Sequence, residues 1–234
     1  MTEISLTLGD VTLRGTVTGC GPTVLLLHAG GERRSVWEPV AAILARQGLR
    51  TVAYDLRGHG DSSGKATTLR TLADDVVEMI GREPVPIVLV GASIGGMAAI
   101  AALAEPAVAK RVAGLVLVDV VPDLAPARAR SWLDFHGLGG CHTHLVDDVL
   151  GSGPALFATA GALDLPILVV HAGRESPLSE SDVRRLRAAN RRVTVARVPA
   201  AGHLVARDAP EELARLVSAH AVAWQSAVPT VERC

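Results

Sequence analysis

Aromatic side chains are scarce in this 234-residue sequence, because phenylalanine, tryptophan and tyrosine together make up 3% of it. Single-stranded nucleic acids are bound by stacking their bases on aromatic rings, so this composition argues against such a surface. An excess of one charge is lacking as well, since 23 basic and 24 acidic residues give a formal net charge of −1. Such a chain has no basic field to hold nucleic acid or an anionic membrane. The composition predicts a small-molecule partner.

Cysteines and long hydrophobic runs are also few. Cys20, Cys141 and Cys234 are too widely spaced to form a disulfide framework or a paired metal-binding knuckle. The opening MTEISLTLGD lacks the basic and apolar regions of a secretory signal. The longest apolar runs have the length of strands and are too short to span a membrane. These features predict a cytoplasmic protein and leave its oligomeric state open.

What the sequence does contain is an alternation of strand-like and helix-like segments. ISLTL and VTLRGTVT flank Gly9-Asp10 and predict an antiparallel hairpin. The later runs VLLL, IVLV, GLVLV and ILVV are apolar on both faces, which is typical of parallel strands covered by helices. The sequence therefore predicts a single α/β domain over residues 1–234, with a mostly parallel sheet flanked by helices. The expected strands are Thr23–His28, Arg50–Tyr54, Ile87–Val90, Val112–Val118, Ile167–His171 and Arg192–Val198, and the expected helices are Val36–Gln47, Leu69–Ile80, Ile94–Ala104, Ser181–Ala189 and Pro210–Ala223.

One region, residues 123–165, interrupts this alternation. It is rich in glycine, proline and alanine and is too long for an ordinary connection, so we interpret it as a short lid of helices. Trp132, Phe135 and Leu138 are its candidates for lining a pocket, or else for forming the core of the lid.

The lid also contains Cys141-His142-Thr143-His144, followed by Asp147-Asp148. Cysteine and histidine are good zinc ligands. The cluster lies in an irregular region, however, away from the strand ends where ligands bind in parallel sheets. We expect no metal site.

The stretch LVGASIGGMA places Ser93 between a predicted strand and a predicted helix. In a sharp strand-to-helix turn, a nucleophile is held in a strained conformation, and the residues two before and two after it must be very small. Gly91 and Gly95 meet that requirement. The helix that follows offers free N–H groups to a developing oxyanion. The competing interpretation is a serine that caps an ordinary helix.

Four stretches together give the chain a resemblance to the α/β-hydrolase fold superfamily, which extends from about Thr23 to Ala223. In that family a His-Gly oxyanion loop follows the third strand, and an Asp-x-Arg-Gly-His-Gly-x-Ser turn comes next. The serine elbow and a late histidine loop complete the pattern. The corresponding stretches are LLLHAGG (Leu25–Gly31), YDLRGHGDS (Tyr54–Ser62), GASIGG (Gly91–Gly96) and PAAGHLVARDAPEEL (Pro199–Leu213).

The resemblance implies roles for individual residues. Ser93 corresponds to the nucleophile and His203 to the general base, which must act together because a serine hydroxyl is a weak nucleophile on its own. The backbone N–H groups of Gly30 and Ile94 would form the oxyanion hole. Neither a metal nor an organic cofactor is implied.

The acid of the triad is the point at which the sequence departs from the family. The family usually has an aspartate where this chain has Ser176, in the turn after the strand Ile167–His171. Glu175 could replace it from the neighbouring position. We favour Asp119, which ends an apolar strand where an unpaired carboxylate would be costly. The alternative role for Asp119 is to cap a helix or anchor the lid.

These residues predict a serine hydrolase that cleaves an ester, thioester or lactone of a small molecule through an acyl-serine intermediate. An acyltransferase, a cyclase or a cofactor-free perhydrolase could use the same site with another acceptor. A ligand-binding protein with a vestigial site is a further alternative, supported only by the serine at position 176.

Overall fold

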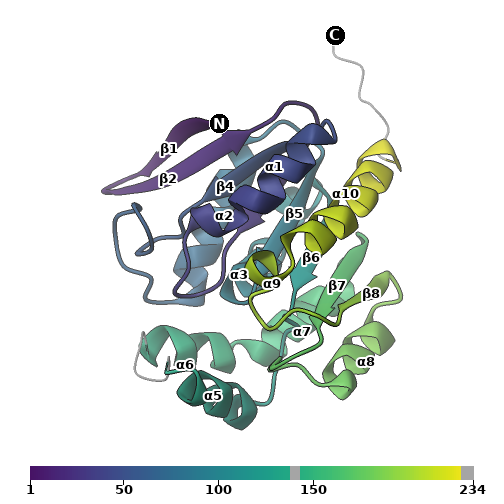
Figure 1. The fold of residues 1–234 in the computed structure, drawn as a ribbon. Helices are drawn as coiled ribbons and strands as arrows, with labels where there is room; N and C mark the ends of the chain where they lie inside the picture. Colours follow the sequence, from purple (N-terminus) through teal and green to yellow (C-terminus); the bar gives the residue numbers. More distant parts are fainter. Residues whose placement is uncertain (138–142, 228–234) are drawn as a thin grey trace.

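The protein is described by a computed structural model that covers residues 1–137 and 143–227. In these residues an eight-stranded sheet has the order β1-β2-β4-β3-β5-β6-β7-β8 (Figure 1). β1 and β2 form the predicted hairpin, β2 is antiparallel to β4, and the remaining neighbours in this sheet are parallel. The predicted fold class is thus confirmed. The strands are β1 (Thr2–Leu8), β2 (Val11–Thr18), β3 (Thr23–Leu27), β4 (Arg50–Tyr54), β5 (Ile87–Ala92), β6 (Val112–Val118), β7 (Ile167–Ala172) and β8 (Val193–Val198).

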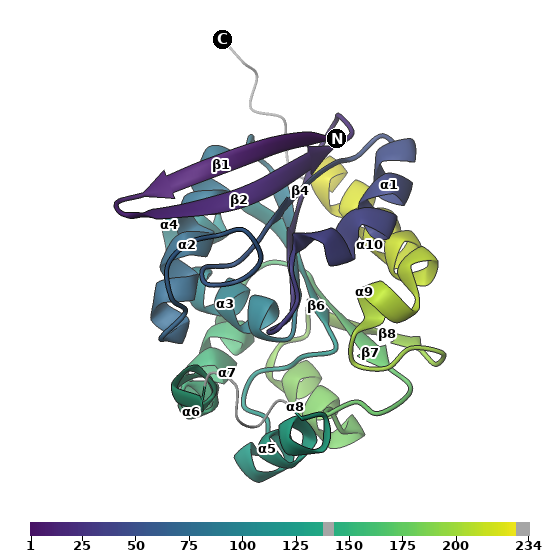
Figure 2. The same cartoon turned by 60° about the vertical axis from the view of Figure 1, so that its left-hand side comes forward.

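Helices cover both faces of the sheet, as Figure 2 shows. Successive side chains of a strand point to opposite faces, so β3 contributes Val24 and Leu26 to one hydrophobic cluster and Leu25 and Leu27 to the other. α1 and α10 pack into the first cluster, and α2, α3 and α8 into the second. Their bounds are α1 (Glu38–Arg46), α10 (Pro210–Ala227), α2 (Leu69–Arg82), α3 (Ile94–Ala102) and α8 (Glu180–Ala189).

Some short helices were not predicted. The helix expected from Val36 begins as a 3-10 turn, η1 (Arg34–Trp37), and becomes α-helical at Glu38, with a proline in its first turn, where no N–H partner is needed. The helix expected over Ile94–Ala104 ends at Ala102, and a separate short helix, α4 (Pro106–Ala109), follows it. α9 (Val205–Asp208) precedes α10. None of the helices within the described ranges is long and apolar enough to cross a bilayer.

The region expected to be a lid contains α5 (Pro126–Phe135), α6 (Thr143–Gly151) and α7 (Gly153–Ala162). Figure 1 shows α5 and α6 together at the end of the molecule away from the β1–β2 hairpin. Among the described side chains, α5 buries none, whereas α7 buries Leu156 and Ala160. Leu138, Cys141 and His142 lie outside the described residues.

The Tyr54–Ser62 stretch folds into a turn built around Asp55, which is completely buried. Its carboxylate accepts the backbone N–H groups of Arg34 at 2.6 Å and Asp61 at 2.8 Å. Ser62 donates its hydroxyl to the Asp55 carbonyl at 2.7 Å. This part of the family pattern therefore has a structural role, which is to join the turn after β4 to the loop after β3.

Candidate active site

Ser93 lies at the sharp turn between β5 and α3, with φ 48° and ψ −118°. A positive φ is strained for any residue with a side chain and costs about 1–3 kcal/mol. A Cβ at Gly91 would lie 2.5 Å from Gly96 Cα, and one at Gly95 would lie 2.7 Å from the Leu27 carbonyl oxygen. Both glycines are therefore required by close backbone approach. The Ser93 side chain forms no capping hydrogen bond with any described residue, so it does not act as an ordinary helix cap.

The two amides expected to bind an oxyanion come from adjacent loops. A Cβ at Gly30 would lie 3.8 Å from the Ile94 Cγ2 atom, so the loop after β3 meets the first turn of α3. Within residues 1–137 and 143–227, neither the Gly30 nor the Ile94 N–H has a hydrogen-bond acceptor. These amides are thus available to a developing negative charge.

His28 holds the oxyanion loop through two hydrogen bonds of its ring. It is completely buried, its Nε2 accepts the Leu56 N–H at 2.9 Å, and its Nδ1 lies 2.8 Å from the Ala29 carbonyl oxygen. Because Nε2 accepts a hydrogen bond, it carries no proton, and Nδ1 is the nitrogen that donates. Burial lowers the pKa of His28 to about 4, so the ring is neutral at physiological pH and can make both bonds.

Asp119 follows β6 and contacts the histidine after β8. Its carboxylate Oδ2 lies 2.8 Å from His203 Nδ1, and the two side chains are 0% and 8% exposed. An ionised carboxylate only accepts hydrogen bonds, so Nδ1 donates and Nε2 carries the lone pair that a general base needs. Asp119 has φ 49°, and its N–H donates to the Val170 carbonyl at 2.7 Å.

Ser93 is attached to the same strand end, because its N–H donates to the Val118 carbonyl at 3.3 Å. Among the described residues, no hydrogen bond joins Ser93 Oγ to His203. We call the residues that follow the carboxyl ends of β5, β6, β7 and β8, namely Ser93, Asp119, Ser176 and His203, the strand-end rim.

Glu175, the other candidate acid, contacts a different histidine. It has φ 44°, its side chain is 73% exposed, and its carboxylate lies 3.7 Å from His136, which directly follows α5. Its carbonyl oxygen accepts the Trp132 Nε1–H at 2.6 Å. The geometry therefore pairs Asp119, not Glu175, with His203.

Helix α5 covers His203 with an aromatic ring. The Trp132 ring meets the His203 ring edge-on, with centroids 4.6 Å apart, and stacks on His136 at 4.0 Å. Phe135, in contrast, is 80% exposed. Of the three residues expected to line a pocket, Trp132 contacts the rim and Leu138 lies outside the described residues.

Glu32 is a site residue that the sequence analysis missed. Its carboxylate accepts the Ala29 N–H at 3.3 Å in the oxyanion loop. Burial raises the pKa of Glu32, and the Ala29 hydrogen bond and the charges of Arg207 and His203 oppose that rise in part. The only signal in the sequence was an acidic residue directly after the glycines of LLLHAGG.

No metal site emerges from the described part of the chain, where no group of three or more histidine, cysteine or carboxylate side chains could hold an ion. Two carboxylates of the lid cluster have other partners: Asp147 pairs with Arg130 at 2.6 Å, and Asp148 accepts the Leu69 N–H at 2.7 Å. Cys141 and His142 lie outside the described residues.

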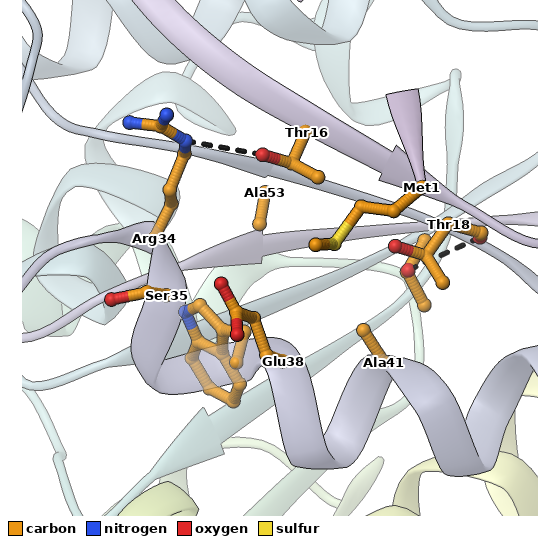
Figure 3. A pocket seen from close by; sticks show the side chains of 10 residues that line it. Met1, Thr16, Thr18, Arg34, Ser35, Glu38, Ala41 and Ala53 are labelled. Carbon is orange, nitrogen blue, oxygen red and sulfur yellow. Dashed lines mark hydrogen bonds between the residues drawn. The ribbon is translucent and has the colours of Figure 1, made fainter. Parts of the chain in front are cut away.

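A small hollow lies beside η1 and α1, between Thr16, Arg34 and Glu38 (Figure 3). Its volume of about 10 Å³ accommodates a single water molecule. No residue of the strand-end rim lines it, so it is separate from the candidate site.

The parallel sheet, the strained serine between β5 and α3, and the aspartate–histidine pair at the strand ends define the class of the α/β hydrolases. A family profile described as "Alpha/beta hydrolase family" matches residues 24–160, and the chain belongs to this family.

Its relatives include esterases. Protein phosphatase methylesterase 1 of Mus musculus is 38% identical over 142 residues, which are 57% of this chain and 36% of the relative. The pimeloyl-[acyl-carrier protein] methyl ester esterase of Pseudoalteromonas atlantica is 35% identical over 115 residues, which are 47% of this chain and 42% of the relative. The chain thus matches less than half the length of these curated relatives.

A solved structure supports the fold over nearly the whole chain. The thioesterase domain from the curacin biosynthetic pathway superimposes with a TM-score of 0.76 and covers 93% of this chain and 98% of that domain. Its sequence is 22% identical, so the likeness concerns the fold alone.

Proposed function

We propose that the protein is a serine hydrolase that cleaves a carboxylic ester of a small molecule through an acyl-serine intermediate. The observation that carries this proposal is the 2.8 Å contact between His203 Nδ1 and Asp119 Oδ2 on the same rim as a strained serine. Membership of the α/β hydrolase family supports it. Two relatives named for methyl esters favour an ester with a small alcohol.

The proposed reaction begins with proton transfer from Ser93 Oγ to His203 Nε2, as Oγ attacks the ester carbonyl. Ser93 and His203 have no hydrogen bond in the unliganded site, where catalytic hydrogen bonds are often long before substrate binds. The amides of Gly30 and Ile94 then stabilise the tetrahedral oxyanion, and such a donor is typically worth about 10²–10³ in kcat.

Collapse of the tetrahedral intermediate releases the alcohol, which takes the proton from His203 Nε2. Water then attacks the acyl-serine, again with His203 as general base. Asp119 keeps Nδ1 protonated and stabilises the imidazolium that forms in both halves of the reaction. The reaction requires no cofactor in this scheme. Thioesters and lactones would react by the same steps.

The alternative of a ligand-binding protein depended on the serine at position 176. Because Asp119 contacts His203 at 2.8 Å, the acid of the triad need not come from position 176, and that argument no longer applies. Acyl transfer differs from hydrolysis only in the acceptor, so rates with water, alcohol, amine and peroxide distinguish the two.

Labelling with a serine-directed fluorophosphonate tests the proposed nucleophile. We expect stoichiometric labelling of the wild-type protein and none of Ser93→Ala. The matched control is Ser179→Ala, since Ser179 lies on another loop and should label as the wild type does. A panel of p-nitrophenyl and methyl esters of graded acyl length then measures the substrate range. Labelling that persists in Ser93→Ala would refute the assignment.

A further inference from the structure

Ser176 occupies the turn where the sequence suggested that an acid was missing, and its hydroxyl contacts the acid that is present. Ser176 Oγ lies 2.9 Å from Asp119 Oδ1 and 2.8 Å from Asp119 Oδ2. The same Oγ accepts the Leu178 N–H at 3.0 Å. The hydroxyl is thus held between the backbone of its own loop and the carboxylate of the neighbouring strand end.

The direction of these bonds follows from the chemistry of the groups. A hydroxyl has one proton and two lone pairs, and the amide of Leu178 uses a lone pair. An ionised carboxylate has no proton to give, so the Ser176 proton points to Asp119 and is shared between its two oxygens. Ala172 donates its N–H to Asp119 Oδ1 at 2.9 Å, and His203 occupies Oδ2.

We propose that Ser176 is a positioning residue, whose hydroxyl fixes the plane of the Asp119 carboxylate so that Oδ2 faces His203. This role rests on the proposed hydrolase function. A carboxylate can rotate about its Cβ–Cγ bond, because sp³–sp² torsions are broad. A donor that contacts both oxygens restricts that rotation and also stabilises the negative charge in a completely buried position.

The loop that carries Ser176 also holds the segment before the base. Gly173 and Arg174 donate their N–H groups to the Ala201 carbonyl oxygen at 3.1 and 3.0 Å. Ala201 precedes His203 by two residues. A single loop therefore makes hydrogen bonds to the acid and to the backbone beside the base, which is how it can set their relative position.

Removing the Ser176 hydroxyl has an electrostatic consequence for His203. The carboxylate of Asp119 would lose a donor, concentrate more negative charge near Nδ1 and stabilise the protonated ring. Two other groups that interact with His203 are unchanged by this substitution: the Trp132 ring from α5 and the Glu32 carboxyl group from the oxyanion loop. The Glu32 carboxyl group also interacts electrostatically with Arg207 and Asp208. The acid limb of kcat/KM should therefore move to higher pH.

The test compares Ser176→Ala, Ser176→Thr and the control Ser179→Ala. Ser179 lies on the same loop and caps α8 through Asp182, so its loss weakens the helix without touching Asp119. We expect Ser176→Ala to lower kcat on a p-nitrophenyl ester about tenfold with little change in KM, as befits a lost hydrogen bond to a charged group. Ser176→Thr should recover most of the rate, and Ser179→Ala should lower the melting temperature only.

A proton NMR titration of the His203 ring requires no substrate and separates this proposal from the proposed function. In Ser176→Ala, the midpoint of the titration should move to higher pH, as the acid limb does. If the wild type hydrolyses no ester but the midpoint in Ser176→Ala still moves to higher pH, only the hydrolase function is refuted. An unchanged midpoint and acid limb in Ser176→Ala would overturn the role of Ser176, as would losses of kcat that are equal in Ser176→Ala and Ser179→Ala.

Discussion

The strand-end rim and helix α5 meet at His203, but they are held in place by different means. Asp119 is 0% exposed, and two hydrogen bonds with the backbone of β7 fix its position: its N–H donates to the Val170 carbonyl, and its carboxylate accepts the Ala172 N–H. α5 buries none of its described side chains and attaches to the loop after β7 and to α8 through polar contacts. These are Trp132 Nε1–H to the Glu175 carbonyl at 2.6 Å, Arg128 Nε–H to the Pro177 carbonyl at 3.0 Å, and an ion pair of Arg128 with Asp182.

This difference separates the strand-end rim, which holds the proposed catalytic groups, from α5, which covers them. Polar contacts at partly exposed positions contribute little net stability, whereas buried hydrogen bonds to a charged group are costly to break. Substitutions in the rim should therefore change kcat, and substitutions in α5 should mainly change KM. The predictions below test that division in order of decreasing effect.

The largest effect is expected from Asp119→Asn. The amide cannot stabilise the imidazolium and favours the wrong tautomer of His203, so kcat should fall about 10⁴-fold. Glu175→Gln, the matched control, should stay within a few-fold of the wild type because that carboxylate faces His136. Steady-state kinetics on one ester measures both variants. Mild and equal losses would contradict the assignment of Asp119.

The buried histidine beside the oxyanion loop should make the stability of the fold sensitive to acid. His28 has its pKa lowered to about 4 by burial, while its ordinary value is 6.5. Between these values the unfolded chain binds a proton that the folded chain does not, so stability falls as the pH drops from 6.5 toward 4. The difference corresponds to about 3 kcal/mol.

Urea unfolding at several pH values between 4 and 7 measures this dependence. His28→Gln keeps a donor and an acceptor in its side chain, and it should reduce the change of the unfolding free energy with pH between 4 and 6.5. A pH dependence that survives in His28→Gln would assign the acid sensitivity to another group.

The smallest effect is expected from Trp132→Ala. An aromatic edge contact is worth about 0.5–1.5 kcal/mol, so removing it should change kcat/KM by about tenfold or less. The change should appear mainly in KM, with kcat and the melting temperature nearly unchanged, because α5 contributes little to the core. A loss confined to kcat would indicate that Trp132 also orients His203.

The sequence was sufficient for the fold and for the residues that motifs mark. Apolar runs on both faces predicted the parallel sheet, and Gly91 and Gly95 predicted the close approach found at the elbow. Asp119 could be favoured over Glu175 because it ends a buried strand. The choice between them depends on which carboxylate contacts His203. No motif predicts the positive φ of 44° at Glu175, whose carboxylate lies near His136 at the end of α5.

The contacts between loops were beyond the reach of the sequence. In the sequence, Ser176 was interpreted only as the position of a missing acid. Its contact with Asp119 could not be predicted because the two residues are 57 positions apart in the chain. Glu32 reaches the site by lateral packing of its loop, for which local periodicity has no signal. Trp132 was a candidate for lining a pocket, but its contact with His203 depends on how α5 packs beside the strand ends.

The left-handed backbone at Asp119, with φ 49°, carries a consequence for the history of such proteins. Asparagine is, after glycine, among the residues that tolerate this conformation best, and it has nearly the shape of aspartate. We therefore expect Asp119→Asn to combine a large loss of turnover with an unchanged backbone. Under the proposed function, a hydrolase and a ligand-binding protein on this scaffold would then differ by a single residue.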